Sequence, residues 1–295
     1  MPPTLLSLPS KLLQAIADQV SFEHDLNALT QSHPRLDEIL TPYIRARKDR
    51  QERSKLLIFA IKSSKPPQLS QLLLRDGADP TVRVEMEQGK TALHFAAETG
   101  QTVVARVLLA HQRSLLDIRD GIGQTPLMCA AKGGHEAVVR TLRSTKYGPA
   151  DVALRDCKKR SALWYAAHGG NVTIVQMLLD TGKIDPKCAD FDGLTPFACA
   201  AREGHSLYGH AEVVQLLLAT GKVQLNARDR SGMTPLMWAA KCRRIPVVKL
   251  LLSTGQVQVD FDLRELRKGA SLFGLREESD LPLLELLNAY KRDNS

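Results

Sequence analysis

The chain has 295 residues, a formal net charge of +8 and a hydrophobic fraction of 43%, a composition that is ordinary for a soluble protein. No stretch approaches the roughly 18 consecutive apolar residues that are needed to cross a bilayer. The sequence also does not open with the basic and then apolar pattern of a secretory leader. These features argue against a membrane or secreted protein, and we expect a cytoplasmic or nuclear location.

The first 45 residues predict a small module of three short helices, because apolar residues recur in them at helical spacing. Pro34 separates the second helix from the third. Leu8-Pro9 begins the first helix, since proline presets the opening helical dihedral. The apolar positions are Leu12, Leu13, Ile16 and Val20, then Leu26 and Leu29, and finally Leu36, Ile39, Leu40 and Tyr43.

This module resembles an F-box, in the degenerate form found at the start of fungal repeat proteins. The residues that carry the resemblance are Leu8, Pro9, Leu12, Leu13, Ile16, Asp25, Leu26, Leu29, Leu36 and Leu40. An F-box implies binding to a Skp-type adaptor, and the implied adaptor-binding residues are Leu8, Pro9, Leu12, Leu13 and Ile16. The alternative interpretation is a helical cap that shields the first repeat of the array that follows.

A basic run, YIRARKDRQERSK, occupies residues 43–55, with Asp49 and Glu52 interleaved among its lysines and arginines. We expect 46–55 to be a solvated helical linker. The sharper hypothesis is a nuclear-import signal or a contact with an acidic partner.

Five stretches further along the chain are versions of one another. They read TALHFAAETG, TPLMCAAKGG, SALWYAAHGG, TPFACAAREG and TPLMWAAKCR, and their first paired alanines are Ala96, Ala130, Ala166, Ala200 and Ala239. The steps of 34, 36, 34 and 39 residues between these alanines are typical of a stacked repeat architecture. Each stretch predicts a helix, which a Thr-Pro start opens in three of the five and a glycine closes in all but the last, where Arg243 takes the place of the glycine. A second apolar-periodic helix follows each time.

The pattern resembles the ankyrin repeat, whose signature is T-P-L-H-x-A. The resemblance implies an all-α fold, an ankyrin-repeat solenoid of stacked helix pairs preceded by the F-box-like module. The expected organisation is an F-box-like module at 1–45, a basic linker at 46–55 and ankyrin repeats over 56–290. Clear units are expected near 89–119, 123–153, 159–189, 193–227 and 232–262, with degenerate units at 56–80 and 269–290.

A target-binding strip follows from the repeat register, since ankyrin proteins usually meet targets with loop tips and the exposed side of the first helices. The predicted target-binding residues are Tyr165, His168, Phe191, Arg202, Trp238 and Lys241. Phe95, Tyr165 and Trp238 share the slot before the alanine pair, where a part-buried apolar residue is the alternative to a surface anchor. Tyr208, in an apparent insertion at 206–210, is expected on the opposite edge.

No catalytic motif, phosphate-binding loop or Cys/His metal spacing is present in the sequence. We therefore expect no enzyme activity, no cofactor, no metal, no specific nucleic acid and no membrane partner. The hypothesis is a monomeric protein-interaction module that serves as substrate receptor of an SCF-type ubiquitin ligase, binding a Skp-type adaptor and an unknown target. The alternative is an ankyrin scaffold or regulatory inhibitor with no link to ubiquitin.

Overall fold

The computed structural model describes residue 13 and residues 34–144, 148–203, 209–259 and 281–293. Every regular element in these ranges is a helix, accompanied by two isolated β-bridges, Val84–Lys90 and Arg155–Ser161. Within the same ranges, no helix is both long and apolar enough to span a membrane. The chain divides into two compact units, residues 1–82 and 83–295.

The first unit contains α3 (Pro34–Lys62) and α4 (Pro67–Arg75), which pack on each other. Helix α3 runs without a break across the expected boundaries at 45 and 55, so the third module helix, the basic linker and the start of the first degenerate repeat form one helix. No proline or glycine occurs between Tyr43 and Lys62 to stop the helix.

Ser54 anchors α3 to the segment that follows α4. Its side chain is fully buried, its hydroxyl accepts the backbone N–H of Asp79 at 2.8 Å and it donates to the carbonyl of Arg50 at 2.8 Å. Arg53 adds a hydrogen bond to the carbonyl of Asp76 at 2.8 Å. The basic run is therefore part of the packing of this unit as well as a charged helix face.

Most of the predicted adaptor-binding residues, Leu8, Pro9, Leu12 and Ile16, lie outside the described residues. Leu13 is described, is helical and is only 3% exposed. Its side chain is therefore not available at the surface in this conformation.

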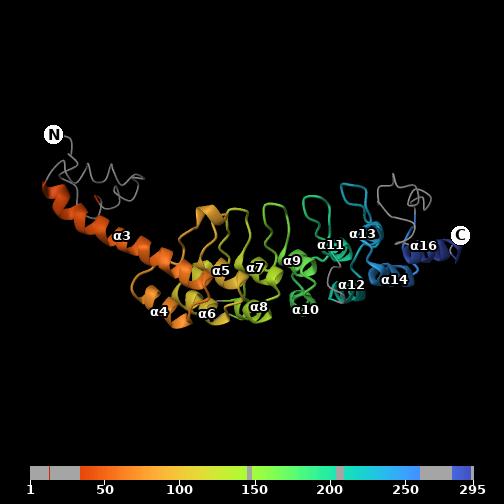
Figure 1. Ribbon diagram of the computed structural model, residues 1–295, viewed down its shortest axis with the longest axis horizontal. Coiled ribbons are helices and arrows are strands. Elements are labelled where there is room, and N and C mark those ends of the chain that lie inside the picture. Colours follow the sequence, from red (N-terminus) through yellow and green to blue (C-terminus); the bar gives the residue numbers. More distant parts are fainter. Residues whose placement is uncertain (1–12, 14–33, 145–147, 204–208, 260–280, 294–295) are drawn as a thin grey trace. The chain divides into compact units, whose positions relative to one another are not determined.

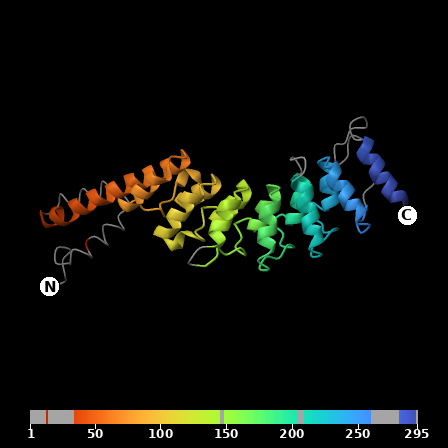
Figure 2. The same cartoon turned by 90° about the horizontal axis from the view of Figure 1, so that it is seen from below.

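The second unit consists of consecutive helix pairs (Figure 1). The first helices of the pairs form one layer, each packed on the next, and the second helices form another (Figures 1 and 2). The pairs are α5 (Ala92–Glu98) with α6 (Thr102–His111), α7 (Pro126–Gly133) with α8 (Glu136–Arg143), α9 (Ala162–His168) with α10 (Val172–Leu179), α11 (Pro196–Glu203) with α12 (Gly209–Ala219), and α13 (Pro235–Lys241) with α14 (Ile245–Ser253). Helix α16 (Leu281–Asp293) packs on α14, and the short helices η2 (Glu85–Glu87) and η3 (Arg113–Leu115) lie in connecting segments.

The helix starts that the sequence predicts are confirmed. The Thr125, Thr195 and Thr234 hydroxyls accept backbone N–H groups in the first turns of α7, α11 and α13 at 3.4, 3.1 and 3.2 Å. The alanine pairs are also fully buried between first helices. A methyl side chain lets neighbouring helices approach closely, so the repeated alanines set the spacing of this layer.

Four aspartates shape the loops that precede first helices. One carboxylate oxygen of each accepts two backbone N–H groups, from the residues two and four positions later, at 2.8 to 3.0 Å; the aspartates are Asp120, Asp156, Asp190 and Asp229. Backbone hydrogen bonds then join each loop tip to the next, for example Phe191 N to Lys158 O at 2.8 Å. The loops therefore form one braced edge of the unit.

Two residues, Arg243 and His210, depart from what the repeat pattern predicts. Arg243 occupies the helix-ending position with φ of 59°, where Gly100, Gly134 and Gly170 have φ of 67° to 74°. His210, which the sequence assigns to the projecting insertion, is instead buried, and its Nε2 bonds to the carbonyl of His168 at 2.9 Å. This contact repeats the one that His135 makes to the carbonyl of Glu98.

We expect the buried His94 to make the stability of the second unit sensitive to acid. Its ring is fully buried, Nδ1 accepts the Thr91 backbone N–H at 3.2 Å, and Nε2 therefore carries the proton donated to the Gln124 carbonyl at 3.0 Å. Burial lowers the pKa of His94. The unfolded chain, with an ordinary histidine pKa of about 6.5, takes up this proton first, so stability is present above that pH and is lost as pH falls below it.

We expect His94→Met to remove part of this acid sensitivity. Methionine is the residue that the chain itself places at the equivalent positions Met128 and Met237. Urea unfolding of both proteins at pH about 7.5 and about 5.5 brackets the ordinary histidine pKa. The wild type should lose more stability between the two pH values than the variant, and equal losses would contradict the role assigned to His94.

Candidate functional site

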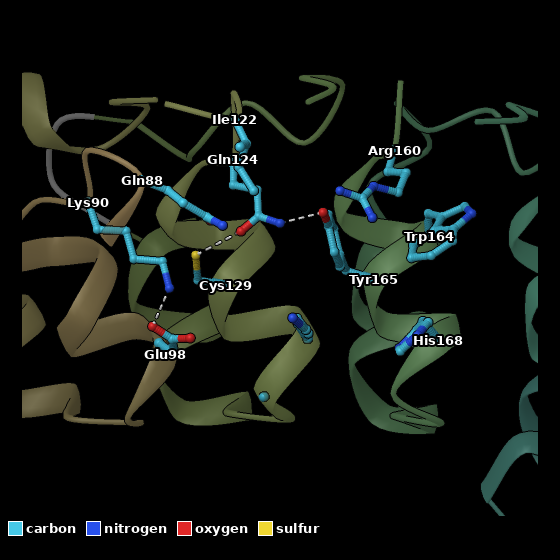
Figure 3. Close-up of a pocket in the computed structure, with 12 residues that line it drawn as sticks. Gln88, Lys90, Glu98, Ile122, Gln124, Cys129, Arg160, Trp164, Tyr165 and His168 are labelled. Atoms are coloured by element: carbon cyan, nitrogen blue, oxygen red, sulfur yellow. Dashed lines mark hydrogen bonds and ion pairs between the residues drawn. The ribbon is translucent and has the colours of Figure 1, made fainter. Parts of the chain in front are cut away.

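A hollow of about 430 Å³ opens on the first-helix layer, across α5, α7 and α9. Figure 3 shows the side chains that line it, among them Lys90 and Glu98 from the first of these repeats and Trp164, Tyr165 and His168 from the third. Lys90 and Glu98 pair at 2.7 Å and neutralise each other at one side. Apolar, aromatic and charged groups therefore meet in one recess, a composition that is common in protein-binding and ligand-binding surfaces.

Tyr165 belongs to the floor of this hollow and is only 2% exposed. Its hydroxyl donates to Asp156 Oδ2 at 2.8 Å and accepts a hydrogen bond from Gln124 Nε2 of the preceding repeat. Arg160 pairs with the same carboxylate at 2.7 Å and lies over the tyrosine ring, 4.9 Å from its centroid. The prediction that Tyr165 is a surface anchor is wrong, because Asp156 and Gln124 draw its polar end inward.

Trp164 and His168 form the side of the hollow nearest α11. Their rings stack with centroids 5.3 Å apart and an angle of 23°, and Arg160 covers the indole at 5.3 Å. Burial lowers the pKa of His168, and the carboxylate of Glu203, 3.9 Å away, opposes that shift. His168 is therefore a half-exposed, polar aromatic group at the rim.

A second cluster, which we call the helix row, consists of Arg202, Trp238 and Lys241 on α11 and α13. Arg202 and Lys241 both lie 5.3 Å from the centroid of the half-buried Trp238 ring. The indole N–H donates to Asp229 Oδ2 at 2.7 Å, and Glu203 pairs with Arg202 at 2.7 Å. The structure thus brings three of the predicted target-binding residues together, and Glu203 joins them to His168.

Phe191 lies apart from the helix row, on the tip of the loop before α11. The residue is 50% exposed, and the Arg230 guanidinium and the Lys159 ammonium lie 4.2 Å and 5.7 Å from the centroid of its ring. We call Lys159, Phe191 and Arg230 the tip cluster. Exposed aromatic rings flanked by arginine are frequent anchors in protein interfaces.

The residue in the slot before the alanine pair differs in exposure between repeats. Phe95 is buried, as the alternative interpretation held, Tyr165 is buried by its hydrogen bonds and Trp238 remains half-exposed. The sequence analysis did not single out Trp164, Arg160, Gln124 or Arg230. Trp164 directly precedes Tyr165 and Arg160 lies shortly before it, so the repeat register was an available signal for these two residues. Gln124 and Arg230 lie in loops that are not adjacent to the predicted strip, and the register did not point to them.

The described residues contain no group of three or more His, Cys, Asp or Glu side chains placed to hold a metal ion. Cys129, at the floor of the hollow, is buried, and burial raises the pKa of its thiol to about 12. This thiol is therefore neutral at physiological pH and serves as a small packing residue.

Stacked helix pairs with braced loops and mixed aromatic and charged surfaces define a repeat protein of the binding class. A family model described as "Ankyrin repeats (3 copies)" matches residues 57–156, 145–208 and 206–263. The chain belongs to this ankyrin-repeat family, and it is an all-α solenoid as the sequence predicts.

Several curated proteins share this repeat region. Protein glp-1 of Caenorhabditis elegans is 35% identical over 158 residues, which cover 50% of this chain and 12% of that protein. Human ankyrin repeat domain-containing protein 63 is 38% identical over 112 residues, or 37% of this chain and 29% of that protein. Human transient receptor potential cation channel subfamily A member 1 is 34% identical over 136 residues, or 45% of this chain and 11% of that protein. The chain thus spans less than a third of each of these relatives.

Proposed function

We propose that this protein is a binding module that recognises a protein target along its first-helix layer, with His168 and the helix row as the central contacts. The observation that carries the proposal is the convergence of Arg202 and Lys241 on the Trp238 ring. Trp and Arg dominate the free energy of protein interfaces when they combine partial exposure with a fixed geometry. Asp229 and Glu203 fix the indole and the guanidinium here, so little side-chain entropy remains to be lost on binding.

The proposal is tested by comparing variants of the full chain in quantitative pull-downs. Proteins retained by the wild type should be lost with Trp238→Ala and with Arg202→Ala, each of which should weaken binding by about 2 kcal/mol. Lys222→Ala is the matched control, because this exposed lysine lies beyond the second helix of its repeat. Circular dichroism checks that the variants are folded. Tyr208, which lies outside the described residues, provides the contrary outcome. If binding of the target is unchanged by both substitutions and is weakened only by Tyr208→Ala, the binding face lies elsewhere.

We further propose that the N-terminal module links this target to an SCF-type ubiquitin ligase, in the cytoplasm or the nucleus. The support is the sequence resemblance of residues 5–44 to an F-box. Because Leu13 is buried, the proposed adaptor contact rests on Leu8, Pro9, Leu12 and Ile16. A scaffold or inhibitor with no ubiquitin link is the competing function, since the repeats themselves are common to both.

A pull-down with a purified Skp-type adaptor separates these two functions. The wild-type chain should retain the adaptor, and the double substitution of Leu8→Ala with Pro9→Ala should abolish retention while the thermal melt of the repeats stays unchanged. Failure of the wild-type chain to bind the adaptor would sink the ubiquitin-ligase proposal and leave target binding by the helix row untouched.

A further inference from the structure

The tip cluster is held in place by the backbone of three successive loops. Phe191 N donates to the Lys158 carbonyl at 2.8 Å, and Arg230 N donates to the Asp192 carbonyl at 2.9 Å. The two cations that flank the Phe191 ring therefore come from different repeats but from one hydrogen-bonded edge. A surface braced in this way is preorganised for a ligand.

The cations of this surface are not ion-paired within the described residues. Lys158, Lys159 and Arg230 are exposed, and none of them has a carboxylate within ion-pair distance among the described residues. Arg160 and Arg202, on the first-helix side, differ because Asp156 and Glu203 pair with them. Lys158, Lys159 and Arg230 therefore place positive charge that is not ion-paired around the exposed Phe191 ring.

We propose that the tip cluster binds an acidic segment of the target protein. An apolar side chain of that segment packs on the Phe191 ring, and its carboxylates pair with Lys159 and Arg230. The inference rests on the proposed protein-binding role and adds the chemistry of the partner. Opposite charges across an interface steer association and fix the register of the bound segment, while the aromatic ring supplies the apolar contact.

A protein segment suits this surface better than a nucleic acid or a membrane. Asp192 is exposed on the same loop tip as Phe191, and its carboxylate repels a dense row of phosphates. A peptide avoids this repulsion because its carboxylates can be spaced to meet the cations and not the aspartate. Polyanion binding normally relies on an uninterrupted basic surface.

The test selects peptides from a random display library on the full chain. Three proteins are compared: the wild type, the cluster variant with Lys159→Gln and Arg230→Gln, and the control variant with Lys183→Gln and Lys222→Gln. The control removes the same charge from exposed lysines that lie after second helices. We expect the wild type and the control to select peptides in which Asp or Glu flanks an apolar residue, and the cluster variant to lose that enrichment.

Fluorescence anisotropy of a selected peptide then measures affinity. Neutralising both cluster cations should weaken binding about ten-fold, which corresponds to two partly exposed ion pairs. Phe191→Ala should weaken it by a similar factor. The difference between wild type and cluster variant should shrink as salt is raised from about 50 mM to about 200 mM, because salt screens exposed charges.

The outcomes separate this inference from the proposed function. Selected peptides without acidic enrichment that still depend on Trp238 would overturn the acidic-segment inference and leave binding at the helix row standing. Equal selection by the wild type and the cluster variant would also overturn it. Tighter cluster-dependent binding of a single-stranded oligonucleotide or of phosphatidylserine vesicles than of any peptide would reassign the site to a polyphosphate or a membrane. Acidic peptides that depend on the tip cluster but not on Trp238 would support the inference and count against the helix row.

Discussion

Asp156→Asn should lower the free energy of unfolding by about 3 kcal/mol, the range observed when one partner of a buried ion pair is removed. The carboxylate is fully buried, and its Oδ2 accepts from the Tyr165 hydroxyl at 2.8 Å and from two nitrogens of Arg160 at 2.8 and 2.7 Å. An amide nitrogen at this position presents hydrogens to those donors, so the tyrosine and arginine lose their acceptor.

Asp120→Asn is the matched control. Asp120 is the equivalent aspartate of the preceding repeat, and only one of its two carboxylate oxygens accepts hydrogen bonds. Its Oδ1 accepts the same pair of backbone N–H groups, at 3.0 and 2.8 Å, while its buried Oδ2 has no hydrogen-bond partner. The residue nine positions on is Cys129, where Tyr165 stands in the later repeat. Asparagine keeps the Oδ1 acceptor, and we expect the loss of stability to be below about 1 kcal/mol.

Urea unfolding followed by circular dichroism and tryptophan fluorescence measures both variants. Trp164 lies beside the affected network and reports on this repeat directly. Equal destabilisation by the two substitutions would contradict a stabilising role for the contacts of Asp156 Oδ2 with Tyr165 and Arg160. The stabilisation would then come from the backbone hydrogen bonds to Oδ1, which both aspartates make. If the slope of the unfolding free energy against urea concentration is the same for variant and wild type, the substitution has changed stability and not the surface exposed on unfolding.

The fold of the second unit could be predicted from the sequence because its signals are local and repeated. The threonine caps and the loop aspartates act within one repeat, and the alanine pairs recur at the same place in each repeat, so each copy confirms the register of the others. Helix α3 shows the opposite case. A change in composition after residue 45 suggested a linker, but a charged segment without proline or glycine continues a helix as readily as it ends one.

The sequence predicted which repeat positions the residues of the candidate site occupy, but it did not predict which of their side chains are exposed. Tyr165 and Trp238 occupy the same slot, and both donate to the loop aspartate nine residues earlier, Asp156 and Asp229. Tyr165 is nevertheless buried, because Gln124 reaches it from the preceding repeat and Arg160 covers its ring. One of these contacts comes from a different repeat, so the repeat that contains Tyr165 does not by itself determine the exposure of that residue.

Ala166→Leu should lower the stability of the second unit by about 1–3 kcal/mol through overpacking. Ala166 is fully buried in α9, which packs on α7 on one side and on α11 on the other. An isobutyl group in place of the methyl has no room unless the helices separate. Separation would also disturb the loop edge, since backbone hydrogen bonds join the loops of the same repeats.

Ala110→Leu is the control, because this alanine is exposed on α6 and leucine is nearly as good a helix former as alanine. Its thermal unfolding should match that of the wild type, while Ala166→Leu should unfold at a lower temperature. Stability in repeat arrays is a sum of local and nearest-neighbour contributions. Hydrogen exchange should therefore accelerate most in α7, α9 and α11. A melt unchanged by Ala166→Leu, or faster exchange spread evenly over the second unit, would contradict the packing of first helices through their alanine pairs.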